Sequence, residues 1–184
     1  IAFSLGGNTS ASHTTNWGDN NNSGMMQIKV EVGSEEDVTI NSIDLRAFGT
    51  GNDKDGISLV SVYTDVESDG KIGLDDKISG IDKFNSDDSI INVGINQVIP
   101  LNTTKYFLIT YKMSNKTSDG QTYYFELTST KVSAASGKKI TTSGFILKSA
   151  TKTISGSPPA IVCSSYTDNA TCGAQSSCNW CQIE

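Results

Sequence analysis

The chain has 184 residues, of which 36% are hydrophobic, and a formal net charge of −6. This length allows one well-packed core with a small appendage, and the negative charge argues against a phosphate-binding surface, so we expect no nucleic-acid partner. No segment approaches the roughly 20 consecutive apolar residues of a membrane-spanning helix, so we also expect no membrane span.

The first predicted element is a short apolar strand in residues 1–5, and a polar stretch without periodicity follows it from Gly6 to Gly24. Fully extended, this stretch would span roughly 60 Å. It could therefore carry Ile1, Phe3 and Leu5 into a groove of a neighbouring copy and complete that copy's sheet by strand addition. The alternative is that the strand pairs within its own chain, and the sequence leaves both possibilities open.

Seven strand-like runs, rich in Val, Ile, Thr and Tyr and separated by turn residues, follow along the chain. They are residues 25–32, 37–48, 57–64, 89–101, 105–113, 122–132 and 145–154. Apolar and polar residues alternate clearly in 38–41 and 124–127, so one face of these strands should be buried. The pattern predicts an all-β fold, an antiparallel β-sandwich of about 7–8 strands, with a short helical turn at residues 74–78.

Residues 65–76 place oxygen ligands and a glycine at the offsets of a twelve-residue calcium loop. The predicted ligands are Asp65, Glu67, Asp69, Lys71 and Asp76, where Lys71 contributes its main-chain carbonyl. A hard cation prefers such oxygens, so we expect calcium as the cofactor. Gly70 lies where the loop must turn sharply, and Ile72 is the apolar residue expected to tuck inward.

The calcium loop resembles those of EF-hand and dockerin proteins over these twelve residues. It departs from the EF-hand pattern at Glu67, where a shorter side chain is usual, and at Asp76, where a bidentate Glu is usual. Because the preceding residues 57–64 predict a strand, the loop has no helix pair to open, and we expect it to stabilise the fold rather than to signal. The alternative is an acidic hairpin turn that binds no ion.

A Ser-, Gly- and Pro-rich segment at residues 155–160 predicts a linker to a cysteine-rich tail. The four cysteines of the chain all lie in this tail, at Cys163, Cys172, Cys178 and Cys181. They could form two disulfides or a zinc site, and we favour disulfides because only the last pair has the C-x2-C spacing of structural zinc sites. The C-x-W-C ending resembles part of the plexin-semaphorin-integrin module, which implies an extracellular spacer.

The expected organisation has four regions, which are 1–24 (strand and tether), 25–154 (sandwich with the calcium loop), 155–160 (linker) and 161–184 (cysteine-rich module). Five Asn-x-Ser/Thr sequons are possible glycosylation sites, at Asn8, Asn21, Asn102, Asn115 and Asn169. Sequons and paired cysteines indicate an extracellular or cell-surface location. The chain begins at Ile1 rather than Met, so we expect it to be processed or to be a fragment.

Catalysis is not expected, because the only histidine, His13, lies in the polar stretch and no Gly-x-Ser-x-Gly motif accompanies it. The sandwich is similar in style to prokaryotic surface-protein repeats, particularly around 106–109 and 123–125. We therefore predict a non-enzymatic structural subunit of a surface filament, pilus, tube or layer, which assembles with itself head to tail. The alternative is an adhesive or carbohydrate-binding module of a larger surface protein, with Trp17 as a free aromatic for surface glycans, although an isolated Trp near a terminus more often packs over a sheet edge.

Overall fold

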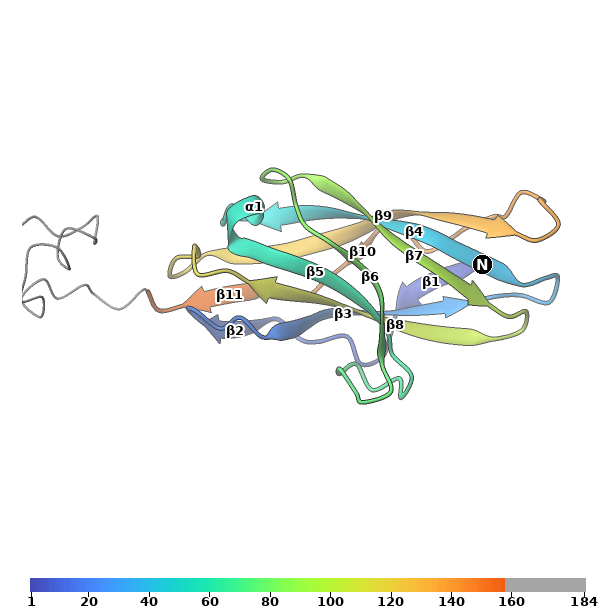
Figure 1. Ribbon diagram of the computed structural model, residues 1–184, viewed down its shortest axis with the longest axis horizontal. Helices are drawn as coiled ribbons and strands as arrows, with labels where there is room; N and C mark the ends of the chain where they lie inside the picture. Colours follow the sequence, from blue (N-terminus) through green and yellow to red (C-terminus); the bar gives the residue numbers. More distant parts are fainter. Residues whose placement is uncertain (158–184) are drawn as a thin grey trace, which may run out of the picture.

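The computed structural model describes residues 1–157, which form two β-sheets packed face to face (Figure 1). The predicted all-β fold is confirmed, and the described residues contain eleven strands and one helical turn. No helix among them has the length and apolar character needed to cross a membrane. The cysteine-rich module, its four cysteines, Asn169 and the second half of the predicted linker lie outside the described residues.

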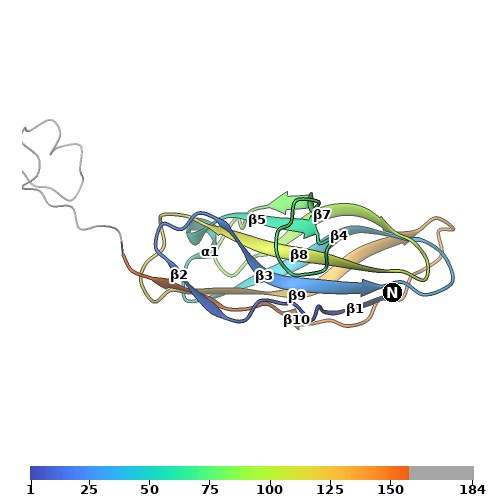
Figure 2. The ribbon, with the colours of Figure 1, turned by 90° about the horizontal axis from the view of Figure 1, so that it is seen from below.

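The first sheet contains five antiparallel strands in the order β1-β3-β8-β5-β6, so β1 and β6 are its edges. Its strands are β1 (Ala2–Leu5), β3 (Asn22–Glu31), β8 (Thr104–Met113), β5 (Ile57–Thr64) and β6 (Lys77–Asp82). Figure 2 shows β1 and β3 running side by side along this sheet.

The second sheet follows the order β2-β11-β9-β4-β7, and a short strand, β10, also pairs with β9. Its strands are β2 (His13–Asn16), β11 (Lys152–Ser155), β9 (Thr122–Ala134), β4 (Val38–Gly49), β7 (Ile90–Ile99) and β10 (Leu147–Lys148). The pairing is antiparallel except between β2 and β11, which run parallel. The sandwich is therefore mostly, rather than wholly, antiparallel.

The core lies between the sheets and is built by the alternation that the sequence predicts. In β9, Tyr123, Phe125 and Leu127 are fully buried, whereas Tyr124 and Glu126 lie on the outer face. Each fully buried aliphatic or aromatic side chain contributes roughly 1.5–3 kcal/mol. Facing residues of both sheets therefore hold the strands, and through them the loops at the strand ends, in fixed positions.

Two expectations for the secondary structure are wrong. Residues 74–78 form no helical turn, because Leu74 is fully exposed and Lys77–Asp82 instead pairs with β5 as β6. The run 145–154 is two strands rather than one, since the Ser149 side chain enters the ladder, where its Oγ accepts a hydrogen bond from the Phe125 amide at 2.9 Å.

The polar stretch from Gly6 to Gly24 is not the free tether that the sequence suggested. Residues 13–16 form β2 in the second sheet, and Thr15 is buried there. This leaves residues 6–12, which we call the hinge, as the connection between β1 and β2. Fully extended, the hinge could span only about 25 Å, so any neighbour that receives β1 must lie close by.

Candidate metal centre and assembly strand

The calcium loop, residues 65–76, leaves the end of β5 and returns as β6, and it projects below the sandwich in Figure 1. Its first predicted ligand is fixed by the sheet, since the Asp65 amide donates to the Tyr106 carbonyl at 3.0 Å and so continues the ladder between β5 and β8. The Asp65 side chain is only 3% exposed. A strand therefore presents a buried carboxylate at position 1 of the loop.

Three of the predicted ligands come together. Carboxylate oxygens of Asp65, Glu67 and Asp76 lie within 4.8 Å of one another. Oxygens bound to one calcium ion at 2.3–2.6 Å can be at most about 5 Å apart, so this spacing suits a shared ion. Among the described residues, none of these carboxylates forms an ion pair with a basic side chain. Three acids in such proximity repel one another unless a cation or protons offset the charge.

Main-chain amides of the loop hold the two end carboxylates in place. Asp65 Oδ1 accepts from the Asp69 amide at 3.2 Å, and Asp65 Oδ2 accepts from the Gly70 amide at 3.0 Å. Asp76 Oδ1 and Oδ2 accept from the amides of Val66 and Gly73, both at 2.8 Å. Asp65 Oδ1 and both Asp76 oxygens accept only one hydrogen bond each, so each keeps a lone pair for coordination, whereas Asp65 Oδ2 also accepts from Gln27 Nε2.

Asp69, a fourth predicted ligand, lies outside this cluster. Asp69 is exposed, and its Oδ1 accepts from the Lys71 amide at 2.9 Å, so it shapes the turn. The Lys71 carbonyl stays a prediction. Gly70 has a φ of 73°, a conformation that favours glycine, as its place in the pattern predicts. Ile72 is 42% exposed, so the expectation that it tucks inward is wrong; no helix pair encloses the loop to bury it.

Gly73 explains how Glu67 can replace a shorter residue at position 3. A Cβ atom built on Gly73 would lie 2.7 Å from Glu67 Oε2, so the glutamate carboxylate occupies the space beside position 9 of the loop. No described residue hydrogen-bonds this carboxylate, which is free to bind an ion. The missing side chain at Gly73 and the extra length of Glu67 thus compensate for each other.

We expect Gly73→Ala to weaken calcium binding about tenfold without destabilising the calcium-free protein. The new methyl group displaces the flexible end of Glu67 rather than any backbone, so the fold itself should tolerate it. Calorimetric titration with calcium, together with thermal unfolding in chelator, measures the two effects. Gly94→Ala, where an added Cβ meets nothing within 4 Å, is the matched control. Unchanged calcium affinity in Gly73→Ala would show that Glu67 is not a ligand.

Two residues that sequence reasoning missed connect the calcium loop to the hinge. Gln27 is fully buried, and its Nε2 donates to Asp65 Oδ2 at 2.7 Å while its Oε1 accepts from the Asn8 amide at 2.9 Å. The Asn8 side chain in turn donates to the Ser68 carbonyl at 2.7 Å. A glutamine inside the apolar run of β3 was the available signal for Gln27, whereas the sequence marked Asn8 only as a sequon and not as a contact of the loop.

The predicted assembly strand pairs within its own chain in this structure, which is the second of the two possibilities that the sequence left open. On one side β1 pairs with β3. On the other side the Phe3 amide donates to the Ser143 carbonyl at 3.0 Å. Phe3 is 3% exposed and its ring lies 5.1 Å from that of Phe145, whereas Ile1 is half-buried and Leu5 is 44% exposed. β1 is therefore an edge strand of its own sheet, and it inserts the Phe3 side chain into the core.

The remaining predicted sites are on the surface or partly covered. The four described sequon asparagines, Asn8, Asn21, Asn102 and Asn115, are all exposed. Trp17 is half-buried and packs against the core, so it is not a free aromatic. His13 contacts the Ala11 carbonyl and the Ser23 hydroxyl, both at 3.1 Å.

Comparison of the sequence with protein-family models finds no matching family. Comparison with curated proteins finds no match either. The calcium loop and the inserted strand β1 are therefore the features from which a function can be inferred.

Proposed function

We propose that this chain is a non-enzymatic extracellular structural protein, the subunit of a surface filament, pilus, tube or layer, which assembles by β-strand addition and is stabilised by calcium. The observation that carries the proposal is the placement of β1. It is a four-residue strand bonded to main chain on both sides, with one large side chain in the core and a seven-residue hinge behind it.

Such a strand can leave its own sheet and enter the same position in a neighbour. After the exchange, β1 would pair with β3 of the neighbouring copy, and Phe3 would contact Phe145 of that copy. These contacts are the same as those within one chain, so the exchange costs little free energy beyond the ordering of the hinge. Each subunit would then give one strand and receive one at a different surface. A head-to-tail contact of this kind does not close on itself and so propagates a filament.

The calcium loop is placed to control the hinge. Asp65 binds Gln27, Gln27 binds the Asn8 amide, and a Cβ on Gly70 would lie 2.3 Å from the Asn8 carbonyl oxygen. An ion held by Asp65, Glu67 and Asp76 would fix these contacts and set the direction in which the hinge leaves the sandwich. Calcium is thus proposed to order the subunit for assembly rather than to act as a signal.

The proposed location suits this role of calcium. A loop that binds calcium with a Kd on the order of 0.1–1 mM is filled outside a cell, so weak affinity is sufficient. The exposed positions of the four described sequon asparagines are compatible with glycan attachment.

The alternative, an adhesive or carbohydrate-binding module, has less support from the aromatic side chains. Besides the packing of Trp17, the outer aromatic pair Phe48 and Tyr124 is stacked at 5.3 Å. Arg46 lies 5.1 Å from the centre of the Phe48 ring, and Lys148 lies 4.1 Å from that of Tyr124. These rings already have neighbours against their faces, where a sugar would stack.

Electron microscopy and light scattering of the purified full chain, in calcium and then in chelator, test the proposal. We expect ordered polymers in calcium that loosen in chelator. A monodisperse monomer in both conditions that binds glycans on an array would support the module instead. A monomer that binds no glycan would contradict both.

A further inference from the structure

A second group of carboxylates lies at the opposite end of β5 from the calcium loop. It consists of Asp53, Asp87 and Asp88, which we call the Asp53 cluster, and its carboxylate oxygens lie within 4.8 Å of one another. Asp53 belongs to the helical turn α1 (Asp53–Gly56), immediately before β5, whereas Asp87 and Asp88 belong to the loop between β6 and β7. Tertiary structure alone brings these two segments together.

The central carboxylate of this cluster is buried and only partly bonded. Asp53 is 0% exposed. Its Oδ2 accepts from the Asp88 amide at 3.1 Å, and its own amide donates to Asp87 Oδ1 at 3.0 Å. Asp53 Oδ1 is inaccessible to solvent and has no hydrogen-bond partner among the described residues. A buried carboxylate oxygen without a partner is costly, so a cation bound at this point would stabilise the fold.

A second polar atom nearby also lacks a partner. The Tyr111 hydroxyl is buried and unbonded within the described part of the chain. The Tyr111 ring lies 6.1 Å from that of Phe84, which belongs to the same β6–β7 loop as Asp87 and Asp88. Asp53 Oδ1 and the Tyr111 hydroxyl would both be relieved by a cation.

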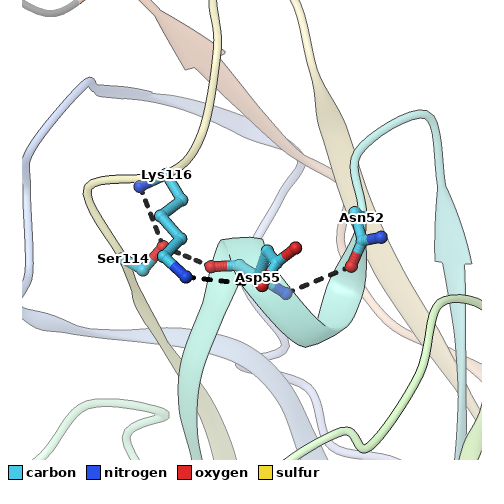
Figure 3. A network of polar contacts seen from close by, with 4 residues as sticks. All are labelled: Asn52, Asp55, Ser114 and Lys116. Carbon is cyan, nitrogen blue, oxygen red and sulfur yellow. Dashed lines mark hydrogen bonds and ion pairs between the residues drawn. The ribbon is translucent and has the colours of Figure 1, made fainter. Parts of the chain in front are cut away.

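No basic side chain supplies that cation, although one is close by. Lys116 Nζ lies 3.6 Å from the carboxylate of Asp55, on the same helical turn as Asp53 (Figure 3). Ser114 donates to the Asp55 carbonyl, and Asn52 accepts from the Asp55 amide at 3.1 Å. Lys116 thus offsets the charge of Asp55 and not that of Asp53. In the described part of the chain, no ion pair involves a member of the Asp53 cluster.

We propose that Asp53, Asp87 and Asp88 form a second calcium site, in which Asp53 is the buried inner ligand and the two exposed aspartates close the site from the rim. All the available donors are oxygens, which favours a hard cation, and a mixture of carboxylates and hydroxyl at irregular positions suits calcium better than the strict octahedron of magnesium. The ion would fasten α1 to the β6–β7 loop. Two calcium ions would then bracket β5, roughly 26 Å apart along the strand.

Calorimetric titration of the full chain with calcium, after treatment with chelator, tests this site. We expect two calcium ions per wild-type chain. Asp88→Asn should weaken one of them at least tenfold; it keeps the residue size, and Asn tolerates the φ of 51° found at this position. Glu67→Gln should weaken the other, and the double variant should bind neither. Asp55→Asn removes the same amount of charge from the same helical turn and should still bind two.

The outcomes separate the two sites. A wild-type chain that binds one calcium, lost in Glu67→Gln and kept in Asp88→Asn, would overturn the second site and leave the loop intact. The reverse pattern would support the Asp53 cluster and refute the loop. Asp53→Asn is a further variant, and if it fails to fold, the exposed Asp87→Asn gives the same readout with its Oδ1 acceptor retained. Binding of two ions by all three cluster variants would also overturn the proposal.

Discussion

Deletion of residues 1–5 is expected to abolish self-assembly and to destabilise the remaining sandwich by about 4 kcal/mol or more. The deletion removes the pairing between β1 and β3 and leaves the place of Phe3 in the core empty. Truncation of one buried phenylalanine alone costs about 3–5 kcal/mol. Light scattering measures assembly, and urea unfolding measures the free energy of unfolding of the truncated chain.

A synthetic peptide of residues 1–7 gives the decisive complement to this deletion. Added in excess, it should bind the truncated chain with saturation and restore most of the lost stability, because it can occupy the same place beside β3. Leu5→Ser is the control within the strand, since this side chain is 44% exposed and its loss should cost no more than about 0.5 kcal/mol. Polymers that form as before without residues 1–5 would refute assembly through β1.

Much of the fold could be predicted because its signals are local. Alternation in β4 and β9 gives both the strand and the face that is buried, and the residues of β5 were predicted with the bounds that the structure has. The turn of residues 65–76 was predicted from local signals too, since twelve consecutive residues supply both its acids and its turn glycine, and calcium binding by this loop stays a prediction. Period and spacing are properties of neighbouring residues, so one sequence is enough to find them.

The features that were missed depend on contacts between distant segments. β2 is the polar run His13–Asn16, which becomes a strand only through its parallel pairing with β11, far away in the chain. β6 is an edge strand with Ile78 and Ile81 exposed, so no buried face marks it in the sequence. The Asp53 cluster joins acids more than thirty residues apart. Residues that meet only through tertiary contacts leave no pattern among neighbouring residues of the sequence, even where they form a chemically distinctive cluster.

Asp65→Ala is expected to destabilise the protein by about 3–5 kcal/mol in about 10 mM calcium, and by roughly half as much in chelator. In chelator, the buried Gln27 amide loses its acceptor along with the amides of Asp69 and Gly70, and an unsatisfied buried donor costs about 1–3 kcal/mol. Calcium adds RT ln(1 + [Ca]/Kd), which is about 1.4–2.7 kcal/mol for a Kd of about 0.1–1 mM. Urea unfolding in the two conditions separates these contributions.

Glu67→Gln distinguishes ion binding from structural support at the same loop. This side chain is exposed and accepts no hydrogen bond from the described residues, so its neutral isostere should leave unfolding in chelator within about 0.5 kcal/mol of wild type. In calcium it should lose most of the stability that the ion in this loop adds, because one of three converging carboxylates is gone. Asp55→Asn, which should still bind calcium at both clusters, controls for a change of charge far from the loop. If Glu67→Gln and the wild type gain the same stability from calcium, residues 65–76 are an acidic turn, and the calcium-dependent role of Asp65 fails with it.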